Sequence, residues 1–189
     1  MLAPVGHGRQ AVNLVLVGYR GSGKTTVGVI LAQRLRWTFV DLDDLVMRQA
    51  GRSIAEVFAQ EGEEGFRLRE RAAFKTVEKA KRLVIALGGG ALLDPEIRAN
   101  IRRAGKVVWL RAPAAVLWGR ISRDPATLRN RPDLTAGGGL VEVEELLKQR
   151  ETLYRIAANH WVDTFPGKPD DVAEVVQTWY EANDAARGR

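Results

Sequence analysis

Short apolar runs alternate along the chain with longer segments in which apolar residues recur every three or four positions. Five such runs are typical of buried strands, over 12–17, 37–41, 84–87, 106–110 and 161–163. Between the first two runs, Val27, Ile30, Leu31 and Leu35 follow a helical period. Because strands that alternate with helices favour a parallel sheet, we expect a single α/β domain over 1–189 with a five-stranded parallel sheet flanked by helices in three layers.

Capping signals indicate where several helices begin. Ser53 and Glu56 form a capping box, and Asp94 followed by Pro95 marks a second helix start. Further helices are expected over 66–81, 113–122, 141–158 and 170–183, with Gly62 and Gly65 separating the first of these from the Ser53 helix. Residues 1–10 and 184–189 show no periodicity, so we expect loose ends there.

The first strand runs directly into a phosphate-binding motif. Gly18, Gly23, Lys24 and Thr25 match the pattern G-x-x-x-x-G-K-[ST] of a P-loop. Glycines let backbone amides surround a polyphosphate at a helix N-terminus, whose partial positive charge favours anions. Lys24 is then expected to reach the β- and γ-phosphates, and the Thr25 hydroxyl to bind Mg²⁺. The alternative, a chance glycine turn before an ordinary helix, would have to match four specified positions between a strand and a helix.

Two carboxylates follow the second predicted strand. Ligands of open α/β sheets bind beyond the C-terminal ends of the strands, so Asp41 and Asp43 are expected on the same rim as the P-loop. One of them can face Mg²⁺ through water while the other faces the phosphoryl acceptor. The structural alternative is a helix start, in which Asp43 and Asp44 cap the helix that follows.

Two further groups of residues point to a small acidic acceptor. Arg67 and Glu70 lie three residues apart on one helical face, either as a surface ion pair of little energetic value or with Glu70 orienting Arg67 towards a carboxylate. Gly88, Gly89 and Gly90 follow the third strand. They indicate either that a small substrate approaches the backbone closely or that the turn is very tight.

Residues 123–139 interrupt the alternation with a basic, proline-containing loop that ends in glycines. Loops of this length are usually functional or disordered. We expect a mobile lid, because an arginine delivered by closure would exclude water and neutralise charge on the γ-phosphoryl group. Arg123, Arg129 and Arg131 are the candidates, and a solvated loop with incidental arginines is the alternative.

Composition narrows the remaining classes of function. The net charge of +6, from 29 basic and 23 acidic residues, raises nucleic-acid binding as an alternative, but the basic residues form scattered clusters without a nucleic-acid-reading motif. The absence of cysteine excludes disulfides, a thiolate nucleophile and zinc-thiolate sites. No apolar run is long enough for a membrane span or a signal peptide, so we expect neither export nor a membrane partner. We also expect a cytoplasmic protein that is a monomer and has no nucleic-acid partner.

The motifs, in this order, resemble the shikimate kinase family of the nucleoside-monophosphate-kinase-like P-loop group. The resemblance covers about residues 11–180. It rests on the P-loop at 18–26, D-x-D at 41–43, F-R-x-x-E at 66–70, G-G-G at 88–90, R-P at 131–132 and R-x-x-L-Y at 150–154. The chain departs from the family where Asp133 follows Arg131 and Pro132, a position at which the family commonly has leucine, and its lid is longer.

This resemblance implies a P-loop kinase fold that transfers the γ-phosphoryl group of MgATP to the 3-hydroxyl of shikimate, in aromatic amino acid biosynthesis. It implies substrate-binding helices over about 43–80. The residues expected to bind ATP are Gly21, Ser22, Gly23, Lys24, Thr25, Thr26, Arg120, Arg131 and Pro169, with Thr25 and Asp41 on Mg²⁺. The residues expected to bind shikimate are Asp43, Arg67, Gly88, Gly89, Gly90 and Arg150, and those expected to act in catalysis are Lys24, Asp43 (as base) and Arg131. Two alternatives remain, another small-molecule kinase such as a gluconate kinase, and a non-catalytic nucleotide switch that binds nucleic acid.

Overall fold

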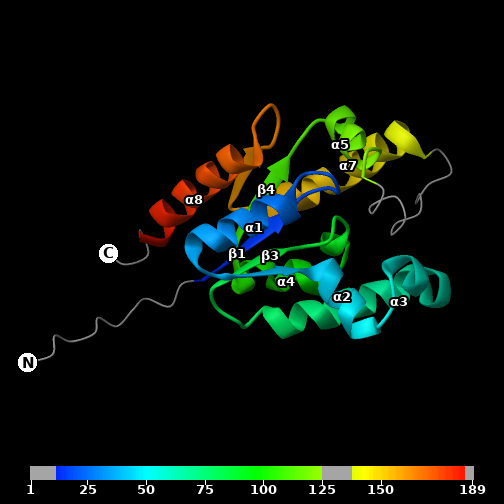
Figure 1. Ribbon diagram of the computed structural model, residues 1–189. Helices are drawn as coiled ribbons and strands as arrows, with labels where there is room; N and C mark the ends of the chain where they lie inside the picture. Colours follow the sequence, from blue (N-terminus) through cyan, green and yellow to red (C-terminus); the bar gives the residue numbers. More distant parts are fainter. Residues whose placement is uncertain (1–11, 125–137, 186–189) are drawn as a thin grey trace, which may run out of the picture.

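A five-stranded parallel sheet forms the centre of the protein. The structure, a computed structural model, describes residues 12–124 and 138–185 (Figure 1). The strands are ordered β2-β3-β1-β4-β5, and each neighbouring pair is parallel. Their bounds are β1 Asn13–Val17, β2 Thr38–Asp41, β3 Leu83–Ala86, β4 Gly105–Arg111 and β5 His160–Asp163. The predicted strands are therefore confirmed, with ends shifted by one residue.

The helices and strands alternate as predicted. The helices are α1 Lys24–Leu35, α2 Leu42–Ala50, α3 Ile54–Val77, α4 Pro95–Ala104, α5 Ala114–Ile121, α7 Gly139–Ala157 and α8 Pro169–Ala185, with a short 3₁₀ turn η1 at Ala91–Leu93. The capping box of Ser53 and the cap by Asp94 are both present, at the starts of α3 and α4. These local signals placed both helix starts correctly.

The prediction of two helices between Ser53 and Lys81 was right about the break between them and wrong about where the second one ends. The segment labelled α3 consists of two helical halves that meet at Gly62, and it ends at Val77, whereas the sequence pattern predicted an end at about Lys81. The kink lies at Gly62, whose φ of 69° and ψ of −174° are not helical. A residue with a side chain adopts this conformation only with strain, so glycine is suited to the break between the two halves.

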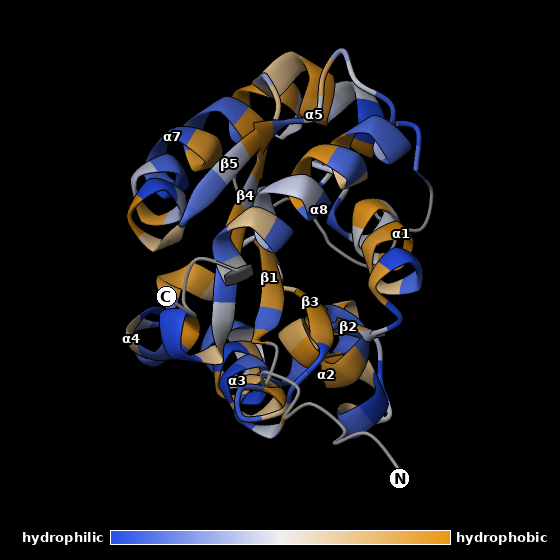
Figure 2. Ribbon diagram, turned by 90° about the vertical axis from the view of Figure 1, so that its left-hand side faces the viewer, coloured by the Kyte–Doolittle hydropathy of each residue, from blue (hydrophilic) through white to orange (hydrophobic). Residues whose placement is uncertain are grey.

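The three layers follow from the alternation of side chains along the central strand. Leu14 and Leu16 of β1 join a buried cluster that includes Leu31 of α1 and Val176 of α8. Val15 and Val17 point to the opposite face of the sheet and join a second cluster, which includes residues of α3, α4 and α7. Successive side chains of a strand point to opposite faces, so one apolar strand supplies both halves of the core. Figure 2 shows these apolar strands between the two groups of helices.

Because every strand is parallel, the C-terminal ends of β1, β2, β3 and β4 lie along one edge of the sheet. The P-loop follows β1, Asp41 ends β2, and the triple-glycine turn follows β3. The fold thus brings three of the sequence motifs to a single rim. In the part of the chain that the structure describes, no helix has both the length and the apolar character needed to cross a membrane.

Several predictions concern segments outside the described residues. The expected loose N-terminus at 1–10, the lid residues 125–137 and the end of the tail at 186–189 lie there, and with them Arg129, Arg131, Pro132 and Asp133. Within the described part, α7 begins at Gly139, the last residue of the expected lid. α8 continues to Ala185, two residues into the expected tail.

Candidate active site

The P-loop is held against β4 and α5 by its glycines. Gly18, Gly21 and Gly23 have φ angles of 143°, 77° and 90°, in the region that side chains disfavour. A Cβ atom on Gly18 would lie 2.4 Å from the carbonyl oxygen of Leu110, and one on Gly21 would lie 3.0 Å from that of Leu117. Both positions therefore require glycine for conformational and steric reasons.

The first turn of α1 is built to receive an anion. Gly23 is its N-cap and offers no side chain to cap the first amides of the helix. Lys24 folds back over the loop, where its Nζ donates hydrogen bonds of 2.9 Å to the carbonyl oxygens of Gly18 and Tyr19. Uncapped amides at a helix N-terminus, with a lysine held beside them, form a phosphate-binding site.

Thr25 and Asp41 supply oxygen ligands suited to a hard divalent cation. The Thr25 hydroxyl donates a 2.8 Å hydrogen bond to Asp41 Oδ2, and both residues line the cleft described below. Burial raises the pKa of Asp41, the neighbouring Asp43 charge raises it further, and the Thr25 hydrogen bond opposes both effects. A hydroxyl and a carboxylate that gains from a positive charge nearby fit Mg²⁺.

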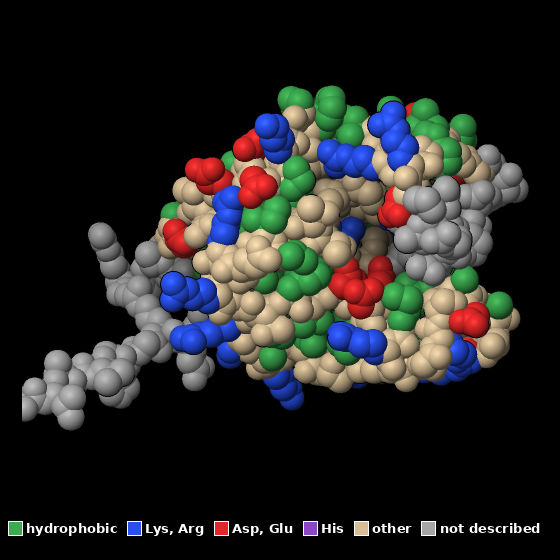
Figure 3. Space-filling view, in the orientation of Figure 1, with side chains coloured by type: hydrophobic (Ala, Val, Ile, Leu, Met, Phe, Trp, Pro, Cys, Tyr) green, Lys and Arg blue, Asp and Glu red, His purple; other side chains and the backbone are tan. Residues whose placement is uncertain are grey.

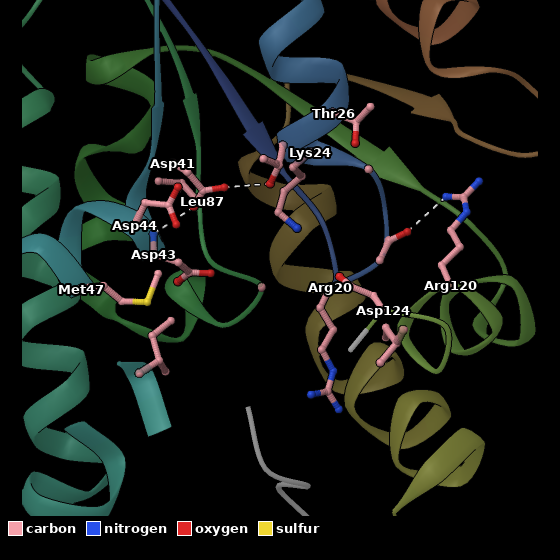
Figure 4. Close-up of a pocket in the computed structure, with 16 residues that line it drawn as sticks. Arg20, Lys24, Thr26, Asp41, Asp43, Asp44, Met47, Leu87, Arg120 and Asp124 are labelled. Atoms are coloured by element: carbon pink, nitrogen blue, oxygen red, sulfur yellow. Dashed lines mark hydrogen bonds between the residues drawn. The ribbon is translucent and has the colours of Figure 1, made fainter. Parts of the chain in front are cut away.

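These groups line a cleft of about 500 Å³ at the C-terminal edge of the sheet. In Figure 3 it is the hollow with Asp and Glu side chains gathered along one edge. Figure 4 shows Asp41, Asp43 and Asp44 on one side of it, with Lys24, Arg20 and Arg120 on the other. The lining residues are Arg20, Gly21, Gly23, Lys24, Thr25, Thr26, Asp41, Asp43, Asp44, Met47, Ile54, Leu87, Gly89, Arg120, Ile121 and Asp124.

The acids after β2 serve both of the purposes that the sequence left open. Asp41 is the N-cap of α2, since its Oδ1 accepts a 3.0 Å hydrogen bond from the backbone amide of Asp43. Asp43 and Asp44 therefore occupy the first turn of α2, where negative charge is favourable. All three also line the cleft. The alternative, in which Asp43 and Asp44 cap this helix, was wrong about the residue, because the cap lies at Asp41.

Arg67 and Glu70 form a close and largely buried ion pair. Arg67 Nη1 lies 2.6 Å from Glu70 Oε2, and the side chains of the two residues are 16% and 1% exposed. Arg67 also pairs with Glu63 at 3.1 Å. Burial acts to lower the pKa of Arg67, but the Glu70 and Glu63 carboxylates outweigh it and raise the pKa above its usual value. The surface ion pair of the alternative interpretation does not describe this geometry.

The triple-glycine turn is crowded by side chains of the protein itself. A Cβ atom on Gly88 would lie 2.6 Å from Glu70 Oε1 and 2.7 Å from Asp43 Oδ1, and one on Gly90 would lie 2.5 Å from Arg67 Nη2. Glycine at these two positions thus lets Asp43, Glu70 and Arg67 reach the turn. The structure thus shows close approach by side chains of the protein itself, and the approach of a small substrate to this turn stays a prediction.

Arg150 and Tyr154 bring α7 to the same turn. Arg150 Nη1 donates to the Gly89 carbonyl oxygen at 3.4 Å, and the Tyr154 hydroxyl donates to the same oxygen. The Arg150 guanidinium also lies 5.5 Å from the centroid of the Tyr19 ring. Of the glycine turn and the residues that contact it from α3 and α7, only Gly89 lines the cleft, whereas Arg67, Gly88, Gly90 and Arg150 do not.

Arg120 joins the P-loop to the segment between β5 and α8. Its guanidinium donates to the carbonyl oxygen of Gly21 at 3.1 Å, and to Thr164 Oγ1 and Thr164 O at 3.0 and 2.7 Å. Arg120 lines the cleft, whereas Pro169 is the first residue of α8 and does not line it. Ser22 is buried within the P-loop, and its hydroxyl has no hydrogen-bond partner among the described residues.

The sequence interpretation missed one ion pair at this site. Arg20 Nη2 lies 2.7 Å from Glu142 Oε1, so the P-loop contacts the first turn of α7 directly. The two residues are 122 positions apart, so no local pattern relates them. The one signal in the sequence was the positive charge of Arg20 within the P-loop. The interpretation also missed Met47, Ile54 and Leu87, which form an apolar part of the lining.

Comparisons with known proteins bear on what such a site does. A family model described as shikimate kinase matches residues 20–181. A shikimate kinase of Rhodopirellula baltica is 44% identical over 160 residues, which are 85% of this chain and 86% of that protein. Shikimate kinase 2 of Yersinia pestis is 45% identical over 150 residues, which are 79% of this chain and 85% of that protein.

Solved structures agree with these sequence comparisons. A shikimate kinase from Acinetobacter baumannii in complex with shikimate is 36% identical, with a TM-score of 0.85 over 92% of this chain and 94% of that one. A gluconokinase from Sinorhizobium meliloti has a TM-score of 0.61 at 16% identity, over 96% and 99% of the two chains. The second likeness shows a shared fold only.

Proposed function

The chain belongs to the shikimate kinase family, and we propose that it transfers the γ-phosphoryl group of MgATP to the 3-hydroxyl of shikimate, giving shikimate 3-phosphate and ADP. The observation that carries this proposal is the meeting of Asp43, the Arg67–Glu70 pair and Arg150 at one glycine turn beside the P-loop. A carboxylate and several hydroxyls are the groups that two guanidiniums, one carboxylate and exposed backbone can recognise. The reaction places the protein in aromatic amino acid biosynthesis.

On the ATP side, the amides over 21–26 and Lys24 hold the phosphates. Thr25 and Asp41 would hold Mg²⁺, Asp41 through water, and the ion would supply positive charge that compensates the phosphates of ATP. The hydrogen bond between the two residues and the raised pKa of Asp41 support this assignment. The protein positions the nucleotide and compensates its charge, because phosphoryl transfer requires little covalent chemistry from the enzyme.

On the acceptor side, Asp43 accepts a proton from the attacking hydroxyl. Arg67 and Arg150 hold the carboxylate of shikimate, and Gly88, Gly89 and Gly90 contact its ring hydroxyls. Glu70 is buried against Arg67 and keeps that guanidinium in one orientation, which supports the assignment. Met47, Ile54 and Leu87 offer the apolar contact that a carbocyclic ring needs.

Three further expectations from the sequence complete the proposal. Arg131 meets the transferring phosphoryl group, Arg120 and Pro169 enclose adenine, and the protein acts as a cytoplasmic monomer. The bonds from Arg120 to Gly21 and Thr164 support its part, since they hold the guanidinium beside the P-loop. Arg131 lies outside the described residues, so its role rests on the motif alone.

The experiment that tests this proposal measures ADP release from MgATP with shikimate, quinate, gluconate, nucleoside monophosphates or no acceptor. Turnover with shikimate alone is the expected result. Turnover with gluconate and silence with shikimate would overturn the acceptor assignment and leave the P-loop assignment intact. Silence with every acceptor, together with salt-sensitive binding of RNA or DNA, would favour a nucleotide switch.

A further inference from the structure

The pair formed by Arg20 and Glu142 is built in the same way as the pair formed by Arg67 and Glu70. In each, an arginine that is partly exposed (13% and 16%) is held by a glutamate that is almost fully buried (0% and 1%). The nitrogen–oxygen distances are 2.7 and 2.6 Å. A guanidinium held by a buried carboxylate is oriented in advance for a second anion, as proposed above for Arg67.

Arg20 lies where the phosphate side of the cleft meets the acceptor side. It stands inside the P-loop and lines the cleft, and its backbone amide nitrogen is 3.2 Å from the Cβ position of Gly89 in the glycine turn. Its guanidinium lies 6.0 Å from the centroid of the Tyr19 ring, whereas that of Arg150 lies 5.5 Å from the same centroid. The guanidinium groups of Arg20 and Arg150 thus both lie near the ring of Tyr19.

The hydrogen bonding of Arg20 is incomplete among the described residues. Nη2 reaches Glu142, whereas Nε is buried and has no partner there. The same is true of Arg67, whose Nε is also buried without a partner. Unsatisfied buried donors are uncommon in folded proteins, and they concentrate where a ligand or a functional rearrangement supplies the missing acceptor. Arg20 and Arg67 share this feature as well as a buried glutamate.

We propose that Arg20 is a third acceptor-side guanidinium, which binds anionic oxygens of the acceptor and is positioned by Glu142. The inference rests on the proposed function and adds to it a residue outside the motifs that define the acceptor site. The anionic oxygens have two sources, the carboxylate of the acceptor or the phosphoryl group once it has been transferred. Arg20 lines the same cleft as Lys24 and Gly89, so both proposed sources of anionic oxygen belong to ligands of the cleft that Arg20 lines.

A purely structural role for the pair is the competing explanation. The ion pair joins the P-loop to α7, so its loss would weaken that contact whether or not Arg20 binds a ligand. Removing Arg20 alone would also take away the guanidinium that pairs with the buried Glu142 carboxylate, and the loss of one partner of a buried ion pair is strongly destabilising. The test therefore measures ligand affinity directly and includes a variant from which both charges are removed.

The experiment is calorimetric titration of the full-length protein with shikimate and, separately, with shikimate 3-phosphate. The variants are Arg20→Gln and the double variant Arg20→Met/Glu142→Gln. The matched control is Arg155→Met, which removes an exposed arginine of α7 that pairs with Glu151 at 2.8 Å. We expect each Arg20 variant to weaken binding about tenfold or more, because a charge-assisted hydrogen bond is lost, and the control to stay within twofold.

The two ligands separate the two sources of anionic oxygen. Equal weakening for both ligands supports contact with the carboxylate, and weakening confined to shikimate 3-phosphate supports contact with the transferred phosphoryl group. Unchanged affinity for both ligands in the folded variants overturns the proposal and leaves the pair with a structural role. If the unaltered protein binds neither ligand, the proposed function itself fails, and this result is distinct from unchanged affinity.

Glu142→Gln tests the positioning half of the proposal. This variant retains Arg20, so it should weaken binding of the ligand affected in the Arg20 variants, but by a smaller factor. Once Arg20 has been replaced by Met, the further change Glu142→Gln should cause no additional loss of affinity. A full additional loss in that background would show that Glu142 acts independently of Arg20 and would overturn its positioning role. Circular dichroism and thermal unfolding of each variant confirm that the comparison is made between folded proteins.

Discussion

The Thr25 hydroxyl lies 2.8 Å from Asp41 Oδ2, and this hydrogen bond joins the first turn of α1 to the end of β2. The other oxygen of the same carboxylate caps α2 through the Asp43 amide. One side chain therefore connects the phosphate-binding helix with the helix that carries the proposed base. In the proposed reaction, Asp41 fixes the distance between the nucleotide and the acceptor and also helps to hold Mg²⁺.

Replacing Asp41 by Asn should separate these two tasks. Asparagine caps helices as well as aspartate does, so the free energy of unfolding without metal should fall by less than about 1 kcal/mol. The loss of charge should raise the Mg²⁺ concentration that gives half-maximal activity, by roughly tenfold or more. Titration of activity with Mg²⁺ at saturating ATP and acceptor measures the effect. An unchanged requirement for Mg²⁺ would contradict the metal role of Asp41.

Asp43→Asn should reduce kcat and leave the KM for shikimate nearly unchanged. Removal of a general base typically costs about two to four orders of magnitude in rate. The neighbouring Asp44→Asn, which also removes a negative charge from the first turn of α2, is the control and should retain most of kcat. Steady-state kinetics decide the matter, and a near-normal kcat for Asp43→Asn would remove this residue from the role of base.

Arg67→Ala should lower kcat/KM for shikimate by about two orders of magnitude, mainly through KM. A charge-assisted hydrogen bond to a carboxylate contributes about 1.5–3 kcal/mol, which agrees with a loss of that size. Arg69→Ala is the matched control, because Arg69 lies on the same helix and pairs with Glu61 at 2.7 Å. Equal losses for the two variants would indicate a general effect on α3 in place of substrate binding.

Gly88→Ala should damage activity far more than stability. The new Cβ would meet the carboxylates of Glu70 and Asp43 at 2.6 and 2.7 Å, and both side chains would have to move away from the turn. We expect kcat/KM to fall by at least about tenfold. Gly119→Ala in α5, where a Cβ meets nothing within 4 Å, should leave activity intact and stabilise the helix by about 0.5–1 kcal/mol. Kinetics and urea unfolding of both variants test this contrast.

Asp94 should make stability depend on pH in the acid range. Burial acts to raise the pKa of Asp94, but the hydrogen bond from Arg71 and the amides of Ile97 and Glu96 hold it below its usual value. Because the pKa is lower in the folded state, ionised Asp94 stabilises the fold above its unfolded pKa, near 4, and this contribution is lost as pH falls through the folded pKa.

Asp94→Asn tests this dependence without removing the cap of α4, since asparagine caps equally well. The variant should lose about 1–2 kcal/mol at pH 7, through the weakened bond to Arg71. The difference from the unaltered protein should shrink as pH falls below 4. Urea unfolding at a series of pH values from about 2.5 to 7 provides the measurement, because this range spans the titration of an aspartate. A difference that stays constant with pH would contradict the assignment to Asp94.

Local patterns in the sequence were sufficient for much of the fold. Strand ends were placed to within one residue, because each strand is a continuous apolar run that ends at a turn signal. The P-loop could be predicted because its glycines serve a local need. Gly21 and Gly23, for example, have positive φ angles, which glycine adopts without strain. The break at Gly62 was also predicted from its glycine, whereas the end of α3 at Val77 was not, because the apolar periodicity continues beyond the last helical residue.

The amino-acid sequence by itself determined the alternation of strands and helices, the phosphate-binding loop and the carboxylates beside it, because each depends on residues within a few positions of one another. Only the tertiary structure decided which side chains meet at the acceptor end of the cleft. Asp43 reaches the glycine turn because β2 and β3 are neighbours in the sheet, and Arg67 and Glu70 reach it from α3, which packs beside that turn. Arg20 meets Glu142 across 122 residues. Such contacts depend on strand order and helix packing, which bring together residues that no local pattern relates.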